Sequence, residues 1–408
     1  MPTAQSNAAR RRVVITGMGA VSAAGIGAQT LWEAAVGGVS QVRKLALSRP
    51  YTGRIHIAAQ VPAFDPAAHM EAEILPYCDP FTQFSVIAAD EAMKQAGFAR
   101  DGLAGKRTAV IIGTGIGGGT SIDNQAYTEY VLKERLDPLS VPRIIPSAAP
   151  TVLSMRYGAK GPTYALASAC SSASQAIGEG LEMIRAGRAD RAVVGGSEAP
   201  INFGGMKAWE LLRVLTPDLC RPFSKGRNGM TLGEGAAVFI LETLESARER
   251  GAAPLCELAG YGTTSDAFDP LRSDLEGPST AMRLALEDAG LAPGEIGYLN
   301  AHGTATYAND INEAEAIRAV FGAAPPPVSS TKPVHGHALG ASGGLELVVT
   351  INAMREQIAP PTINFTEPDP KCPIDPIPNT ARPTPIRAAM SNSFAFGGIN
   401  AVLVVRPA

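Results

Sequence analysis

Short apolar runs alternate along the chain with longer stretches rich in small residues. The runs 13–16, 108–113 and 191–196 show no polar alternation, which is typical of strands buried on both faces. The stretches 171–186 and 338–355 have the length and composition of helices. Glycine and proline, with 43 and 32 residues, separate these segments. The pattern predicts an α/β protein with buried parallel strands.

The N-terminus resembles a targeting signal at first sight. Three arginines at positions 10 to 12 precede an apolar run, which imitates a secretory or twin-arginine signal peptide. The run 13–16 is β-branched and stops at Gly17. This favours a buried first strand that follows a flexible tail over residues 1–10.

An internal repeat divides the chain. The spacing GxGxxS occurs at 17–22 and again at 260–265, each time after a strand-like run. Both copies continue in the same order, with a helix that ends at a glycine, a strand, a second strand leading into a small-residue helix, and a further strand. We predict two duplicated βαβ-type halves, 11–253 and 254–408.

The first half is the longer one because of two insertions, near 38–84 and 120–163. In both halves the loops at the carboxyl ends of the parallel strands are where a site forms in such sheets. Two related halves packed together would turn these loops toward a shared crevice.

Composition excludes several classes of protein. The chain has 35 Lys plus Arg and 38 Asp plus Glu, so its formal charge of -3 favours neither nucleic acid nor an anionic membrane. No run approaches the roughly 18 apolar residues of a membrane span, and we expect a soluble protein. The cysteines are odd in number and lack CxxC spacing, which indicates a reducing, cytoplasmic location without disulfides. They are Cys78, Cys170, Cys220, Cys256 and Cys372.

Cys170 differs from the other cysteines in its local sequence. It lies between a strand and a small-residue helix, at the helix end where free N–H groups and the dipole favour thiolate over thiol. Cys170 is therefore the candidate nucleophile. The alternative is a buried, unreactive cysteine, which is our interpretation of the other four.

Two segments contribute histidine. His302 follows a strand at a glycine turn, a position suited to catalysis, although a core histidine with satisfied hydrogen bonds gives the same pattern. Lys332 and His337 lie directly before the second small-residue helix. Two histidines in that segment also suggest a metal, but no carboxylate or thiol stands at ligand spacing, which argues against zinc.

The segment 391–400 contains Phe396 beside two glycines. Backbone N–H groups in such a turn can stabilise an oxyanion, and an ordinary tight turn is the alternative. Two other glycine-rich segments, 17–19 and 113–118, imitate the dinucleotide fingerprint but lack the acidic residue about 20 positions later. We predict neither a cofactor nor a catalytic metal.

Taken in order, the motifs ASACSSA, NAHGTAT, STKPVHGHALGASGGLE and SNSFAFGGINA resemble those of the elongating, type II-like β-ketoacyl-acyl-carrier-protein synthases. The likeness covers nearly the whole chain. Its Cys, His, His set differs from the Cys, His, Asn set of the initiating and chalcone-synthase-like enzymes, and the second cysteine motif of thiolases is absent. The resemblance implies the thiolase fold, with both halves in an αβαβα layered arrangement, and a homodimer.

The implied activity is that of an acyltransferase that performs a decarboxylative Claisen condensation in fatty acid elongation. Cys170 would accept the acyl group from acyl-ACP, and the N–H groups of Cys170 and Phe396 would hold the oxyanion. His302 and His337 would donate hydrogen bonds to the thioester oxygen of malonyl-ACP, so that loss of carbon dioxide leaves an enolate to attack acyl-Cys170. Phe396 would also gate the second substrate.

The resemblance implies supporting roles as well. Lys332, with Glu313 and Glu346, would orient the histidines and set their charge. The histidines are expected to matter less for acyl transfer, because a dipole-activated thiolate needs no full base. In some relatives a monovalent cation is surrounded by the residues that match Asn300, Glu346, Ser391 and Asn392.

The sequence departs from the family pattern without losing a catalytic group. The departures are Tyr307 for proline, Pro333-Val334-His335 in the lysine loop, Ala395 for glycine, Ile399 for threonine, and Ser224 and Gly226 for acidic residues. They leave open a specialised pathway, such as nodulation-factor, polyene or polyketide synthesis. A cysteine thioester hydrolase is a further alternative, whereas a noncatalytic chain-length factor would normally lack the cysteine.

Overall fold

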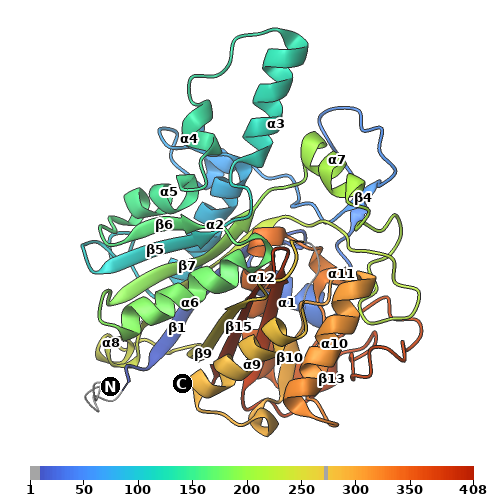
Figure 1. Cartoon of the computed structure of the whole chain (residues 1–408). Helices are drawn as coiled ribbons and strands as arrows, with labels where there is room; N and C mark the ends of the chain where they lie inside the picture. The colour runs from blue at the N-terminus through green and yellow to red at the C-terminus, as the bar shows by residue number, and fades with distance from the viewer. Residues whose placement is uncertain (1–9, 271–273) are drawn as a thin grey trace.

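The computed structural model describes residues 10–270 and 274–408 (Figure 1), so the predicted tail at 1–10 lies outside these ranges except for Arg10. Within them, eleven strands form one mixed sheet. From the centre outward, the first half contributes β1 (Val13–Ser22), β8 (Gly235–Thr243), β7 (Arg191–Glu198), β5 (Thr108–Gly113) and β6 (Thr163–Leu166). The second half contributes β9 (Cys256–Ser265), β15 (Ile399–Arg406), β14 (Ala389–Ala395), β10 (Tyr298–Asn300) and β11 (Val328–Ser329). The short strand β2 (Gly25–Ile26) pairs with β1.

The strand order of one half repeats that of the other. In each half the second strand from the centre runs antiparallel to both neighbours, and the outer three strands run parallel. The halves meet at the centre, where Val14 and Ile15 pair with Glu257 and Cys256. The predicted α/β class and duplication are confirmed, and the boundary at 253/254 stays a prediction.

Helices cover the sheet in alternating layers. α2 (Pro80–Gln95) and α5 (Ala148–Tyr157) pack on the strands of the first half. α6 (Ser172–Arg185) also packs on these strands, and its apolar residues belong to the same core cluster as those of α12. α12 (Ser342–Glu356) contacts α6 and lies on β14. α9 (Glu276–Ala289) packs on β9 and β15, and α10 (Tyr307–Phe321) packs on α9. The strands of the first half form one layer and those of the second half another, with α6 and α12 between them. The order of layers is therefore helix, strand, helix, strand, helix, as predicted.

The remaining elements decorate this framework. The helices are α1 (Ala28–Val36), α3 (Gly119–Tyr127), α4 (Ser140–Ile144), α7 (Phe203–Leu211), α8 (Leu244–Glu249) and α11 (Lys332–His335). Two short strand pairs are β3 (Arg43–Lys44) with β4 (Ile57–Ala58), and β12 (Ile358–Ala359) with β13 (Arg382–Pro383). Figure 1 shows α3 and α4 projecting away from the sheet at the top, within the predicted second insertion.

The repeated GxG motifs have a structural explanation. A Cβ added at Gly17 would lie 2.0 Å from the carbonyl oxygen of Ala92 in α2, and one added at Gly260 would lie 2.2 Å from that of Ala285 in α9. Each motif therefore lets a helix approach its central strand closely. This accounts for the glycine spacing that imitates a dinucleotide site.

The strands are buried on both faces, as their composition predicts. In β5, Val110 and Ile112 join the apolar cluster beneath α2, whereas Ala109 and Ile111 join the cluster that contains α6 and α12. All five cysteines are free thiols inside the protein. None of the helices in the described ranges combines the length and apolar character that a membrane span requires.

Candidate active site

A sharp turn places Cys170 at the start of α6. It belongs to the 3₁₀ turn η4 (Ala169–Ser171), and Ala169 before it has a φ of 49°. That left-handed conformation costs a residue other than glycine about 1–2 kcal/mol. The second half repeats the device at η6 (Leu339–Ala341), where Leu339 has a φ of 45° immediately before α12. The backbone strain at the nucleophile is thus part of the duplicated framework.

The environment of Cys170 corrects one expectation. Burial raises the pKa of its thiol to about 12, although the Lys332 charge and the backbone N–H of Phe396 act in the opposite direction. A thiolate formed by the helix end alone is therefore the wrong description of the free enzyme. The Sγ atom lies 3.1 Å from Nε2 of His337, which places a proton acceptor beside the thiol.

The two predicted histidines meet across the cavity. His302 follows β10 and His337 follows α11, and their ring centroids are 5.3 Å apart at an interplanar angle of 82°. Burial, and then the charge of Lys332, lowers the pKa of both imidazoles well below the ordinary value. Both rings are therefore neutral at pH 7, so each carries one N–H.

Lys332 determines which nitrogen of His302 carries the proton. Its buried Nζ donates to the carbonyl oxygen of His302 and forms an ion pair with Glu346, and it lies 3.4 Å from Nδ1 of His302. An ammonium group has no acceptor, so Nδ1 must accept and the proton must sit on Nε2. His302 is thereby fixed as an N–H donor toward the cavity.

His337 has a more permissive neighbour. Its Nδ1 lies 2.7 Å from the hydroxyl of Ser342, which can either donate or accept. His337 can therefore accept the proton of Cys170 through Nε2 in one step and present an Nε2–H in another.

Glu313 holds the His302 loop in place. Its carboxylate accepts from the backbone N–H groups of His302 at 2.8 Å and Gly303 at 2.7 Å. It also accepts from Asn392 Nδ2 at 3.2 Å. Glu313 thus positions the loop rather than the imidazole ring, while Lys332 contacts the ring itself.

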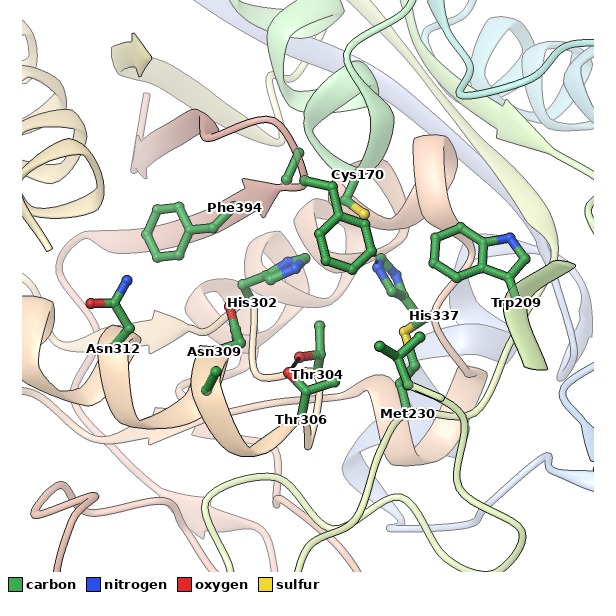
Figure 2. A pocket seen from close by; sticks show the side chains of 14 residues that line it. Cys170, Trp209, Met230, His302, Thr304, Thr306, Asn309, Asn312, His337 and Phe394 are labelled. Atoms are coloured by element: carbon green, nitrogen blue, oxygen red, sulfur yellow. Dashed lines mark hydrogen bonds between the residues drawn. The ribbon is translucent and has the colours of Figure 1, made fainter. Parts of the chain in front are cut away.

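A cavity of about 330 Å³ joins these groups (Figure 2). Cys170 from the first half and His302, His337 and Phe396 from the second half line it, and Lys332 lies behind His302. The structure therefore brings together all five predicted site residues. The shared crevice between duplicated halves is where the sequence placed it.

Other cavity residues were missed in the sequence. Thr304 and Thr306, which are 2.9 Å apart at their hydroxyls, belong to the NAHGTAT motif and were within reach of motif analysis. Asn309 and Asn312 follow on α10, where Figure 2 shows both beside the cavity. Trp209 comes from α7, remote from every motif used above.

Four buried oxygen atoms fit the cation that the resemblance implies. Each lacks a hydrogen-bond partner among the described residues, and they belong to Asn300 (Oδ1), Glu346 (Oε2), Ser391 (Oγ) and Asn392 (Oδ1). Amide, hydroxyl and carboxylate oxygens suit a hard cation, and a buried polar atom without a partner is costly. The residues therefore fit a monovalent cation.

A transition metal suits the cavity less well. Ligand atoms of Cys170, His302 and His337 lie within 4.8 Å of one another. A metal-binding histidine usually donates its other N–H to an acceptor, whereas Nδ1 of His302 faces the Lys332 ammonium. This contact favours a hydrogen-bonding role for His302.

His335, an unusual residue of the lysine loop, is buried outside the residues that line the cavity. Its Nε2 lies 3.0 Å from Thr331 Oγ1. Its Nδ1 has no hydrogen-bond partner in the described part of the chain. Burial, with a contribution from Lys332, lowers the pKa of His335 to about 3.

We expect the unfolding free energy of the unsubstituted protein, the parent, to fall relative to that of the His335→Gln variant as the pH decreases. Below about pH 6.5, His335 binds a proton in the unfolded parent but stays neutral in the folded parent. The unfolding free energy of the parent therefore falls by about 1.4 kcal/mol per pH unit. Glutamine does not titrate. Urea unfolding of both proteins at about pH 7.5, 6 and 5 measures the difference. A difference that stays constant with pH would contradict a neutral buried His335.

Comparison with known proteins identifies the family. Residues 10–247 match the model of the beta-ketoacyl synthase N-terminal domain, and residues 255–366 match that of the C-terminal domain. The chain belongs to the β-ketoacyl synthase family. It is a condensing enzyme of the acyltransferase class, as the sequence predicts.

Relatives of two kinds are similar to this β-ketoacyl synthase. Nodulation protein E of Rhizobium sp. (strain N33) is 43% identical, covering 97% of this chain and 99% of the relative. The 3-oxoacyl-[acyl-carrier-protein] synthase 2 of Staphylococcus aureus (strain N315) is 40% identical, covering 97% and 98%.

Among solved structures, the ishigamide ketosynthase/chain length factor is 35% identical, with a TM-score of 0.95 over 98% of this chain and 100% of that one. The thiolase fold implied by the motifs is thereby confirmed.

Proposed function

We propose that this chain is a β-ketoacyl-acyl-carrier-protein synthase that condenses an acyl group on Cys170 with malonyl-ACP. The observation that carries the proposal is the cavity in which Cys170 Sγ lies 3.1 Å from His337 Nε2, while Lys332 fixes His302 as a second donor. A nucleophile beside a base serves acyl transfer, and paired N–H donors serve an enolate.

In the first step the Cys170 proton passes to His337 as the sulfur attacks the thioester carbon of acyl-ACP. The backbone N–H groups of Cys170 and Phe396 hold the oxyanion. The old carbon–sulfur bond then breaks, and the carrier thiol leaves with the proton from His337. The result is an acyl-Cys170 thioester and a neutral His337.

In the second step His302 and His337 donate N–H groups to the thioester oxygen of malonyl-ACP. The carbon–carbon bond to the carboxylate breaks and carbon dioxide leaves. The electron pair of the broken bond stays on the remaining carbon and forms the enolate. The enolate carbon attacks acyl-Cys170, and the bond to sulfur breaks to release a chain longer by two carbons. The Cys170 thiolate that is left then takes up a proton from water.

The proposed partners are acyl-ACP, malonyl-ACP and a second copy of this chain in the cytoplasm. The name of one relative includes an acyl carrier protein, which supports a carrier substrate. The name of the solved ketosynthase/chain length factor contains two components, which supports assembly with a further chain. Exposed apolar residues between 116 and 145 support a dimer contact there. They are Ile116, Ile122, Tyr130, Val131, Leu132, Leu136, Val141 and Ile145.

Two pathways fit the relatives, namely fatty acid elongation and a specialised pathway like that of the nodulation proteins. Incubation with malonyl-ACP and a panel of acyl-ACPs, followed by mass spectrometry of the carrier, tests the function. We expect ketoacyl-ACP. Free acid would instead indicate a thioester hydrolase, and the acyl groups that react identify the pathway.

Phe396 is proposed to gate the second substrate. It follows Ala395, which has no positive φ, and precedes Gly397 and Gly398, whose φ values are 84° and 69°. Phe396→Ala is expected to lower condensation and to permit carbon dioxide release without prior acylation. Ala395→Gly is the matched control and should be mild or faster. Rapid mixing with and without a bound acyl chain measures both, and strict acyl-first order in Phe396→Ala would refute the gate.

The cation site gives a test that needs no activity. Sodium or potassium, compared with choline at equal ionic strength, should raise the unfolding free energy by about 1.4 kcal/mol at tenfold excess over Kd and by about 2.7 at hundredfold excess. Ser391→Ala removes one of the four buried oxygens without a hydrogen-bond partner, and it should reduce the stabilisation by sodium or potassium. Identical melting in all three salts would exclude a cation in the cluster.

A further inference from the structure

An aromatic side chain outside the sequence motifs stacks on the proposed gate residue, Phe396. The indole of Trp209 stacks on the ring of Phe396, with centroids 6.0 Å apart and planes inclined by 19°. Both rings line the cavity that contains Cys170. Figure 2 labels Trp209 among the side chains that line this cavity. Any movement of Phe396 away from this position breaks the stack.

Trp209 has a firmly held support. It lies on α7, whose N-terminus is capped by Asn202 through its Oδ1, 2.8 Å from the N–H of Gly205. The neighbouring Glu210 accepts from the hydroxyl of Tyr51 at 2.7 Å and from the backbone N–H of Arg54 at 2.9 Å. Figure 1 shows α7 beside the loop that leads to β4.

Phe396 has the opposite support. It sits in the turn between β14 and β15, where a Cβ added at Gly397 would meet no described atom within 4 Å. Backbone hydrogen bonds hold this turn, from Gly397 N–H to the Pro270 carbonyl at 2.9 Å and from Asp266 N–H to the Gly398 carbonyl at 2.8 Å. Backbone with glycine on one side changes conformation at low steric cost. The Trp209 ring is therefore carried on a capped helix, and the Phe396 ring on a glycine turn that can change conformation when its few backbone hydrogen bonds break.

We propose that Trp209 is a positioning residue that holds Phe396 in its closed place until Cys170 is acylated. The inference rests on the proposed condensing function. Aromatic pairs of this kind shift an equilibrium about 2- to 10-fold. Loss of the indole therefore opens the gate by that factor and lets malonyl-ACP enter before the acyl group.

The first test uses Trp209→Leu, with Trp209→Phe as the matched control that keeps an aromatic ring. We expect carbon dioxide release without acylation to rise about 2- to 10-fold in Trp209→Leu and to stay near the parent rate in Trp209→Phe. Acylation of Cys170, followed by intact mass, is measured in both variants, and the ratio of carbon dioxide release without acylation to the acylation rate separates an opened gate from general damage to the cavity that Trp209 lines. Unchanged acyl-first order in Trp209→Leu would overturn the inference.

The second test leaves Trp209 in place. The chain has two tryptophans, and Trp32 is buried in the core with 1% of its surface exposed. In Trp32→Phe, the tryptophan emission of the enzyme, excited at a wavelength that tyrosine does not absorb, therefore comes from Trp209 alone. Malonyl-ACP added to the acylated enzyme should change the emission as the stack breaks, while malonyl-ACP added to the unacylated enzyme should not. Equal signals in both states would refute the role of Trp209.

These experiments separate the two levels of the argument. A parent enzyme that makes no ketoacyl-ACP and releases no carbon dioxide would refute the proposed function. If the parent condenses normally, two results would refute only the role of Trp209. They are strict acyl-first order in Trp209→Leu, and a Trp209 emission in Trp32→Phe that responds equally to malonyl-ACP in the acylated and unacylated states.

Discussion

Replacing Cys170 with glutamine is expected to abolish condensation while preserving carbon dioxide release from malonyl-ACP. The thiol is the acceptor of the acyl group, so the first half-reaction stops completely. The donors for the enolate are His302 and His337, which glutamine leaves in place. The amide is also close in shape to an acylated cysteine, and its oxygen can accept from the N–H of Phe396, which in the parent faces the sulfur of Cys170.

Cys220 provides a matched control for this experiment. It is buried like Cys170, and burial likewise raises the pKa of its thiol to about 12. It lacks the histidine contact, since its Sγ faces the carbonyl oxygen of Thr304 at 3.8 Å. Intact mass should show the acyl adduct in Cys220→Ser and none in Cys170→Gln or Cys170→Ser. An adduct in Cys170→Gln would place the nucleophile at another residue.

The fold was predictable because its constraints are local and repeated. The glycines at 17 and 260 each admit a helix onto a central strand, so they recur in sequence as they recur in space. The small residues around Cys170 and Gly340 recur for the same reason. The left-handed residue occupies the same position in η4 of the first half and in η6 of the second half. A duplication of packing constraints therefore leaves a readable trace in the sequence.

Features that depend on burial and on contacts between distant segments were not predictable. The helix end at Cys170 indicated a thiolate, but burial of the thiol raises its pKa. Trp209 lies 187 positions before Phe396 and shares no motif with it, so the sequence pattern did not predict that the two rings stack. The tautomer of His302 likewise depends on Lys332, which approaches through tertiary packing.

Alanine substitutions at His302 and His337 are expected to separate the two half-reactions. Each removes one N–H donor to the enolate, so each should slow carbon dioxide release by on the order of 10²-fold or more. Their effects on acylation should differ. The sequence alone predicts that acyl transfer tolerates both losses, whereas the structure places His337 Nε2 3.1 Å from the Cys170 sulfur.

With its pKa raised to about 12, the Cys170 thiol needs a proton acceptor at neutral pH. His337→Ala should therefore acylate more slowly than the parent, and its rate should rise about tenfold per pH unit as the thiolate population grows below the pKa. His302→Ala should acylate at the parent rate, because its loss leaves the Cys170–His337 contact intact. Quenched-flow mass spectrometry of the acyl-enzyme at several pH values measures both. Normal acylation by His337→Ala at pH 7 would mean that the helix end activates Cys170 without a base.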